Sequence, residues 1–170
     1  MLDGTLGLGG HAKRWLERST PDGHLVGVDR DPQALMEALR VLSVYGDRAL
    51  ILQGDFRDVW KILQKAGRSP VDAVLLDLGV SSLQLDSAER GFSFRADGPL
   101  DMRMDPAQAL TAEKIVNESD EQTLREILWK YGEERYARRI VERILEARSR
   151  QRIRSTKELE NIVFHGVPKM

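Results

Sequence analysis

The 170-residue sequence contains no cysteine, which excludes disulfide bridges and thiolate metal ligands. No apolar run approaches the roughly 18 residues that a membrane-spanning helix needs, and no signal peptide precedes the first glycines. The three histidines, His11, His24 and His165, are widely spaced, so we expect no metal site. Gly9-Gly10-His11 lacks the lysine of a P-loop, which argues against a P-loop NTPase. These absences indicate a cytoplasmic protein with no membrane segment.

Charge is distributed unevenly along the chain. Hydrophobic residues make up 41% of the sequence and charged residues 31%, enough for one domain of ordinary size with its own core. Residues 1–124 carry 14 Lys and Arg against 20 Asp and Glu, whereas residues 125–157 carry 11 against 5. The basic stretch fits a polyanionic partner. It equally fits a solvated helix face, because Arg and Glu are good helix formers.

Apolar runs and amphipathic stretches alternate in the first 80 residues. The runs at 24–29, 49–53 and 71–78 predict buried strands, and the stretches at 31–42 and 59–66 predict helices. Strands that alternate with helices imply right-handed crossovers and a parallel sheet. The sequence therefore predicts an α/β fold, with ligands bound beyond the carboxyl ends of the strands.

The second half has a different character. Residues 79–106 are rich in glycine and proline, which predicts a loop, and helical patterns dominate after it. Ser119–Gln122 and Ser155–Glu158 both fit capping boxes. We expect a core domain at 1–106 that includes an active-site loop at 79–106, followed by a helical subdomain at 107–165. The predicted helices are 111–117, 120–131, 133–149 and 156–164.

A glycine-rich turn, Asp3–His11, opens the chain ahead of the first predicted helix. Glycines let the backbone turn sharply and approach a ligand, and the start of a helix offers free N–H groups. Asp29 follows Gly9 by 20 residues, a spacing that suits an acid at the end of the next strand binding ribose hydroxyls. The turn and Asp29 predict a site for a nucleoside-containing cofactor, against the alternative of a purely structural turn.

The electrostatics of the turn favour one cofactor over another. A dinucleotide loop usually reads G-x-G-x-x-G, whereas this turn reads G-x-G-G and follows Asp3. A carboxylate there would repel a diphosphate but attract the sulfonium and ammonium groups of S-adenosylmethionine. The residues therefore favour S-adenosylmethionine over NAD, and with it a methyltransferase over an oxidoreductase. Phe56 either covers the adenine or is a core aromatic.

Several motifs together resemble a known family. They are the turn Asp3–His11, Val28–Pro32, the block Leu75–Asp86, the loop Glu89–Asp105 and Tyr131–Arg135. The sequence is similar over nearly its whole length to the bacterial 16S ribosomal RNA cytosine-N4 methyltransferases of the MraW/RsmH type. The resemblance implies a Rossmann-like methyltransferase domain with an inserted helical domain for substrate recognition. It also implies methyl transfer from S-adenosylmethionine to the N4 of a cytidine in the small ribosomal subunit.

The resemblance also implies the cofactor residues, of which Gln84 comes from the resemblance alone. They are Gly9, Gly10, His11, Asp29, Phe56, Asp77 and Gln84. Members of the family have a longer segment before the first strand and continue beyond the last residue of this chain, so we expect a member shortened at both ends. The alternative function is a non-catalytic fragment that binds only S-adenosylmethionine or RNA. The sequence does not indicate an oligomeric state.

The chemistry of the reaction points to candidate catalytic residues. The N4 lone pair of cytosine is delocalised into the ring, so the enzyme must hold N4 in line with the methyl group and accept its protons. Many amino-group methyltransferases use an Asp/Asn-Pro-Pro-aromatic tetrad after this strand, where the present sequence has Asp77-Leu78-Gly79-Val80. We expect Asp77 and Ser81 to bind the hydrogens of the amino group, with Ser82 or a backbone carbonyl around Leu78-Gly79 as alternatives. Ser81 and Ser82 could instead cap a turn.

Two further groups of side chains are candidates for RNA contacts. Phe92 or Phe94 would stack on an extruded base, or both would join the core of an ordered loop. Arginines of the basic stretch would contact phosphates, which predicts binding that weakens steeply with salt. These arginines are at positions 135, 138, 139, 143, 148, 150, 152 and 154.

Overall fold

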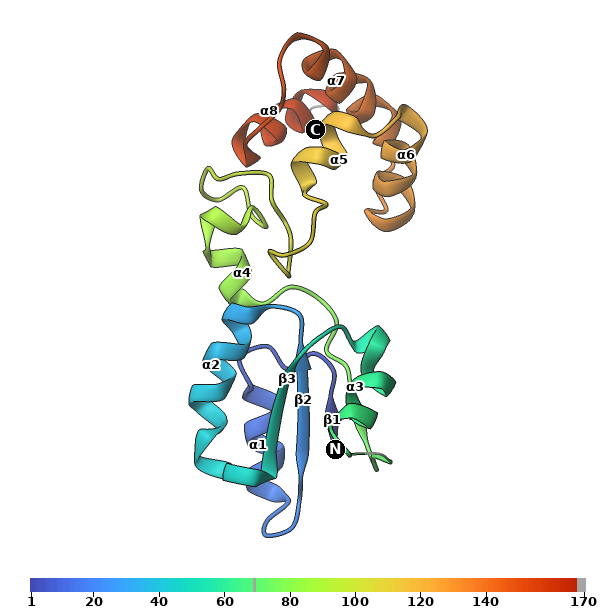
Figure 1. Cartoon of the computed structure of the whole chain (residues 1–170). Coiled ribbons are helices and arrows are strands. Elements are labelled where there is room, and N and C mark those ends of the chain that lie inside the picture. Colours follow the sequence, from blue (N-terminus) through green and yellow to red (C-terminus); the bar gives the residue numbers. More distant parts are fainter. Residues whose placement is uncertain (69, 168–170) are drawn as a thin grey trace. The chain divides into compact units, whose positions relative to one another are not determined.

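A computed structural model describes residues 1–68 and 70–167 of the chain. The chain divides into two compact units, residues 1–81 and residues 82–170, and each is described by itself below. In Figure 1 the first unit, blue to green, contains the sheet, and the second, green to red, is helical. In the described part of the chain, no helix is both long enough and apolar enough to cross a membrane.

The first unit contains a four-stranded parallel sheet in the order β3-β2-β1-β4. Strands β2 (Leu25–Asp29) and β3 (Ala49–Gln53) confirm two of the sequence predictions. Strand β4 covers only Val74–Leu75, and the prediction of a strand over 71–78 is wrong in length. Its partner β1 has two residues, Leu2–Asp3, so the ladder between them is as short as β1 itself.

Helices cover both faces of this sheet (Figure 1). Helices α1 (Gly10–Arg18) and α2 (Pro32–Leu42) lie on one face, and α3 (Val59–Lys65) lies on the other. Successive strand residues alternate between the faces. Leu25 therefore joins the α1 and α2 layer, while Val26 packs with Leu63 of α3. Short 3-10 segments at Ser43–Arg48 and Phe56–Asp58 complete the unit.

The strand order places a topological switch point between β1 and β4. The chain runs outward from β1 to β2 and β3, then returns across the sheet to β4 on the other side of β1. In open parallel sheets, ligands bind beyond the carboxyl ends of the strands at such a point. Asp3 ends β1 and Asp77 follows β4, so both carboxylates belong to this edge of the sheet. The α/β fold with a Rossmann-like sheet is confirmed.

The second unit is built from short helices around its own core. Leu100, Val116, Leu124, Ile140 and Ile153 are among its buried residues. Its helices are α4 (Ser82–Asp86), a 3-10 turn (Ala88–Arg90), α5 (Ala112–Glu118), α6 (Glu121–Glu126), a π-helical turn (Ile127–Tyr131), α7 (Ala137–Arg150) and α8 (Thr156–Gly166).

The two predicted capping boxes have different outcomes. At α8, the Ser155 hydroxyl accepts from the Glu158 N–H while the Glu158 carboxylate accepts from the Ser155 N–H, so this box is confirmed. At α6 the prediction is wrong by one residue. Asp120 is the N-cap and accepts from the Thr123 N–H at 2.7 Å, whereas Ser119 ends α5. A carboxylate also suits the positive end of a helix, which favours Asp120 over its neighbour.

The glycine-rich loop belongs to the helical unit rather than to the sheet. The division falls at residues 81 and 82, earlier than the boundary expected at 106 and 107. The Thr156 N–H donates to the Gly98 carbonyl, and the Gly98 N–H donates to Thr156 Oγ1. The Leu100 N–H donates to the Arg154 carbonyl. Loop residues near 100 are therefore tied to the start of α8, a long-range pairing that local sequence patterns do not encode.

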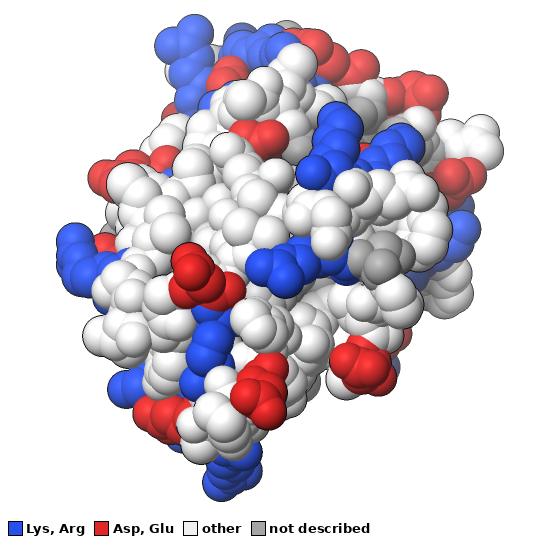
Figure 2. Space-filling model, turned by 60° about the horizontal axis from the view of Figure 1, so that its bottom comes forward, with Lys and Arg blue, Asp and Glu red and all other residues white. Residues whose placement is uncertain are grey.

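Acidic and basic side chains are interspersed on the molecular surface, as the face in Figure 2 shows. Most arginines of the basic stretch have partners within the second unit. Arg138, Arg143 and Arg150 pair with glutamates of α7, and Arg152 pairs with Glu113 and Glu118. The Arg148 side chain donates to the Val116 carbonyl. These exposed pairs are weak, so they do not prevent phosphate contacts but do reduce the net positive field.

Candidate cofactor site and the glycine-rich loop

The glycine turn is held against the end of β2 by its backbone. Gly7 and Gly9 have positive φ angles of 52° and 81°, which favour glycine because it lacks a Cβ. The Leu6 N–H donates to the Val28 carbonyl at 3.0 Å. The Gly7 N–H donates to Asp29 Oδ2 at 2.7 Å. The turn therefore has one defined conformation, with Gly9 as the N-cap of α1.

Asp29 is fixed from two sides. Besides the bond from Gly7, its Oδ1 accepts from the Asp31 N–H at 2.9 Å. An ionised carboxylate has about four acceptor positions, so each oxygen keeps capacity for another donor. A carboxylate that is half-buried and already oriented by backbone N–H groups loses little freedom when it binds hydroxyl groups. This geometry suits the ribose-binding role predicted for Asp29.

Asp3 is the most unusual group of the site. It is 1% exposed, and its Oδ1 accepts from the Thr5 N–H at 3.1 Å. Among the described residues, no hydrogen-bond partner reaches its buried Oδ2. Burial raises the pKa of this carboxyl, and the carboxylates of Asp29 and Asp77 add to the effect while His11 opposes it. A buried, unpartnered oxygen of this kind fits a positively charged or hydrogen-donating ligand.

Asp77 and His11 meet at the same edge of the sheet. The Asp77 N–H donates to Thr5 Oγ1 at 2.7 Å, which fixes the backbone after β4 to the turn. The His11 Nε2 atom lies 3.4 Å from Asp77 Oδ2. Both side chains are well exposed, at 62% and 70%. Their polar ends are therefore accessible to a substrate as well as to each other.

Phe56 lies beside the glycine turn. A Cβ placed on Gly4 would be 3.2 Å from Phe56 Cβ and 2.6 Å from Leu76 Cδ2, so only glycine allows these segments to approach so closely. Phe56 is half-buried, which is compatible both with a core position and with one face against a ligand. Its neighbour Asp55 pairs with Arg57, which is the main reason that the pKa of Asp55 is lowered.

Of the predicted residues, the structure brings together Gly9, His11, Asp29, Phe56 and Asp77 in the first unit, around the turn. Gly10 is the first residue of α1, and a Cβ there would meet open space. Ser81 is the last residue of the same unit. Gln84 belongs to the second unit, where it is 4% exposed on α4.

Sequence reasoning missed one residue of this site, Thr5. Its hydroxyl accepts the Asp77 N–H and its own N–H donates to Asp3. Thr5 thereby links the two strand ends that flank the switch point. A threonine after Asp-Gly is a signal that could have been noticed, because a hydroxyl in a turn commonly bonds nearby backbone groups.

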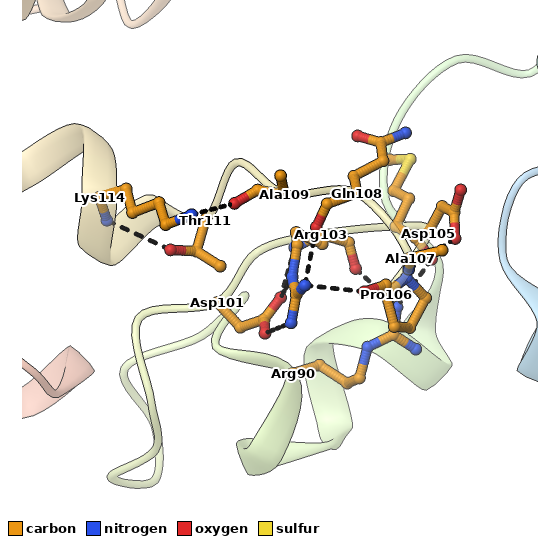
Figure 3. A network of polar contacts seen from close by, with 11 residues as sticks. Arg90, Asp101, Arg103, Asp105, Pro106, Ala107, Gln108, Ala109, Thr111 and Lys114 are labelled. Carbon is orange, nitrogen blue, oxygen red and sulfur yellow. Dashed lines mark hydrogen bonds and ion pairs between the residues drawn. The ribbon is translucent and has the colours of Figure 1, made fainter.

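An arginine network orders the loop at residues 101–109 (Figure 3). The Arg103 guanidinium makes a two-pronged contact with the Asp101 carboxylate and donates to the carbonyls of Pro106 and Gln108. The pairing with Arg103 lowers the pKa of Asp101. Arg90, 6% exposed, donates to the carbonyls of residues 103 and 104. The predicted active-site loop is therefore rigid around its Asp-Met-Arg-Met core.

Two glycines of the same loop are required by close backbone contacts. A Cβ on Gly91, whose φ is 69°, would be 2.2 Å from the Pro99 carbonyl oxygen. A Cβ on Gly98 would be 2.0 Å from the Ala88 carbonyl oxygen. Phe94 is 63% exposed, whereas Phe92 is half-buried with the Arg90 guanidinium 5.9 Å from its ring centre. Of the two aromatic side chains, Phe94 is therefore the one that is exposed to solvent.

The sheet order, the glycine turn and the carboxylates at the switch point fit a Rossmann-like domain of the kind that methyltransferases contain. Comparison with known sequences identifies the family. The model of the MraW methylase family matches residues 1–170, and the chain belongs to that family.

Two relatives show how far the similarity extends. Ribosomal RNA small subunit methyltransferase H of Syntrophotalea carbinolica is 50% identical over 167 residues, which are 98% of this chain and 53% of that protein. The protein of the same name from Desulfosudis oleivorans is 51% identical over 168 residues, which are 99% of this chain and 54% of that protein. The chain thus spans about half the length of the curated relatives it matches.

Proposed function

We propose that this chain is part of a methyltransferase that uses S-adenosylmethionine to methylate RNA of the small ribosomal subunit, at the exocyclic N4 of a cytidine. The observation that carries the cofactor assignment is the buried, unpartnered Oδ2 of Asp3 beside the glycine turn. Its carboxyl interacts electrostatically with the side chains of His11, Asp29 and Asp77. Such a site suits a cationic cofactor and disfavours a pyrophosphate.

The residues that would hold the cofactor follow from the site. The turn at Gly9, Gly10 and His11 and the carboxylate of Asp29 would bind its nucleoside end, and Phe56 would cover the adenine. Gln84 is included through the family resemblance. S-adenosylmethionine supplies an electrophilic methyl group on a positively charged sulfur. The ribosomal RNA substrate is supported by the printed names of the relatives.

The chain's own contribution to the reaction is to position and deprotonate the amino group. Cytosine N4 is a poor nucleophile, so its alignment must be supplied by the protein. Asp77, accessible and fixed by Thr5, would accept a hydrogen of the amino group, and His11 at 3.4 Å would orient that carboxylate. Ser81 would supply a second polar contact. Helix α7 arginines and Phe94 would contact the RNA.

The first test measures cofactor binding by calorimetry. We expect Asp29→Asn to weaken S-adenosylmethionine binding roughly tenfold, because a hydrogen bond to a charged group contributes about 1.5–3 kcal/mol. The control is Asp47→Asn, an exposed carboxylate of the same unit. Equal affinity in both variants, or tighter binding of NAD than of S-adenosylmethionine, would contradict the cofactor assignment.

The second test measures transfer of a tritiated methyl group to cytidine in small ribosomal subunits. Asp77→Ala and Ser81→Ala should lower the rate, and wild-type rates in both would remove them from the mechanism. The alternative function is binding of S-adenosylmethionine or RNA without turnover. Cofactor binding without methyl transfer would establish that alternative.

A further inference from the structure

The second unit contains a hollow away from its core, between α6, the π-helical turn and the start of α7. Its volume is about 750 Å³, within the range of roughly 300–1,000 Å³ that is usual for small-ligand sites. Trp129 and three arginines, Arg125, Arg135 and Arg138, are among the residues that line it. All of them belong to the same unit, so the hollow does not depend on any other part of the chain.

Trp129 is exposed where a packed helix would normally bury such a ring. It is 65% exposed, whereas its neighbour Leu128 packs against the core of the unit. The backbone here forms a π-helical turn, with the Gly132 N–H donating to the Ile127 carbonyl at 3.1 Å. Single π turns within helices occur frequently at functional sites. The turn presents the indole at the hollow instead of in the core.

The charged side chains of the hollow favour one anionic group of low charge. Three arginines face two glutamates, Glu121 and Glu126. The acids are engaged, because Glu121 lies 3.8 Å from Arg125 and Glu126 accepts from the Gln122 amide at 3.1 Å. A small excess of positive charge suits a phosphodiester better than a polyphosphate.

Arg135 is the cation best prepared to meet such a group. Its guanidinium carbon lies 5.6 Å from the ring centre of Tyr136, which restricts the side chain. A guanidinium can bond a phosphate with two parallel hydrogen bonds, and less entropy is lost when it is already oriented. Arg138 pairs with Glu142 at 3.0 Å and can share its charge with the hollow.

We propose that this pocket binds one nucleotide of a single-stranded RNA, with the base stacked on Trp129 and the adjacent phosphate on Arg135. Proteins commonly bind single-stranded RNA by stacking its bases on aromatic side chains and by contacting its phosphates with arginines. None of the residues that line the pocket is among those proposed to hold the cofactor, and the pocket gives the helical unit a defined contact with the substrate. The proposal rests on the proposed function in one respect, that the partner is RNA.

The experiment measures binding of a fluorescent single-stranded 12-nucleotide RNA to the full chain by anisotropy. Trp129→Ala should weaken binding roughly tenfold, the order of one lost base–aromatic stack, and Trp129→Phe should restore most of it. The matched control is Trp60→Ala, because Trp60 is 61% exposed on α3 in the first unit. Both alanine variants should retain wild-type melting temperatures, since neither ring is in a core.

A second pair of variants tests the phosphate contact. Arg135→Ala should reduce the slope of log affinity against log salt by about 0.7, the value for one phosphate of a single strand. Arg40→Ala, which removes an exposed arginine of the first unit already held by Glu37 at 3.2 Å, should leave the slope unchanged. An RNA duplex of the same length should compete poorly with the single strand.

The outcomes separate this proposal from the proposed function. Equal RNA affinities for wild type, Trp129→Ala and Trp60→Ala would overturn the pocket assignment, and would do so even if S-adenosylmethionine binds and methyl transfer occurs. The same result combined with a Trp129-dependent association with ribosomal proteins would assign the pocket to a protein partner instead. Loss of cofactor binding in the wild type would contradict the proposed function while leaving the Trp129 comparison valid.

Discussion

At the scale of single residues, the cofactor site is an arrangement of carboxylates that the fold alone does not favour. Asp29 is stabilised by two backbone N–H groups, whereas Asp3 is buried with one oxygen unpartnered. Such a group costs stability in the absence of a ligand. Residues that lower the stability of the folded protein are expected at sites where ligand binding requires them. Asp3 therefore links the stability of the first unit directly to its cofactor.

Asp3→Asn should stabilise the protein without cofactor and weaken S-adenosylmethionine binding. The neutral amide avoids the desolvation of a charge, and we expect a gain of about 1 kcal/mol. For a unit of this size, the midpoint of thermal unfolding should rise by roughly 4–8 °C. Thermal melts and calorimetry measure the two effects, with Asp47→Asn as the control. Lower stability together with unchanged binding would contradict this role of Asp3.

The effect of Asp3→Asn has a defined pH dependence. Burial raises the pKa of Asp3, so the folded state disfavours the ionised form and wild-type stability is reduced at neutral pH. As the pH falls through this raised pKa toward the ordinary value of 3.8, the carboxyl becomes neutral and the penalty disappears. The stability difference between Asp3→Asn and wild type should therefore narrow on acidification. A constant difference from pH 7 to pH 4 would exclude an electrostatic cause.

At the scale of elements, helix ends are determined by which side chain reaches the first free N–H groups. Ser119 and Asp120 are adjacent, and both are residue types that cap helices. A capping box at Ser119 was expected, yet Ser119 closes α5 and Asp120 caps α6. Both residues have extended backbone, with φ −70° and ψ 150° at Ser119 and φ −71° and ψ 169° at Asp120, so the backbone does not decide between them. The Asp120 carboxylate is the group that reaches a free N–H of α6, that of Thr123 at 2.7 Å.

Asp120→Ala should destabilise the second unit by about 1 kcal/mol, the usual value of an N-cap. Ser119→Ala should change stability by a few tenths of that, because its hydroxyl does not cap α6. The two variants differ by one position, so each serves as the control for the other in urea unfolding. A larger loss for Ser119→Ala would show that the capping box expected from the sequence is the correct one.

The sequence predicts best what is local. The apolar runs of β2 and β3 and the capping box at Ser155 were predicted correctly, because each depends on neighbours within a few residues. The length of β4 and the boundary near residue 81 depend on distant partners, β1 in one case and residues 154–156 in the other. Trp129 was not singled out, because its helical spacing alone does not reveal exposure.

At the scale of the whole molecule, the sheet of the first unit ends in an edge with apolar side chains. Strand β4 is at one end of the strand order. Val74 on this strand is 59% exposed, and three apolar residues at every second position after it, Leu76, Leu78 and Val80, are 46–68% exposed. Of these four residues, only Val74 belongs to β4, and the other three follow it outside the strand. An exposed edge strand is a template for pairing with another chain, and proteins commonly blunt such edges with lysine.

The exposed edge predicts self-association that increases with protein concentration and depends on β4. Val74→Lys should shift the chain toward monomer, because a charge on the edge strand opposes pairing and the side chain already lies in solvent. Leu110→Lys is the matched control, since Leu110 is 61% exposed in a loop of the second unit. Sedimentation velocity at increasing concentration measures the effect. If wild type, Val74→Lys and Leu110→Lys sediment alike at every concentration, β4 is not the associating surface, and the apolar side chains along this edge are tolerated in water without a partner.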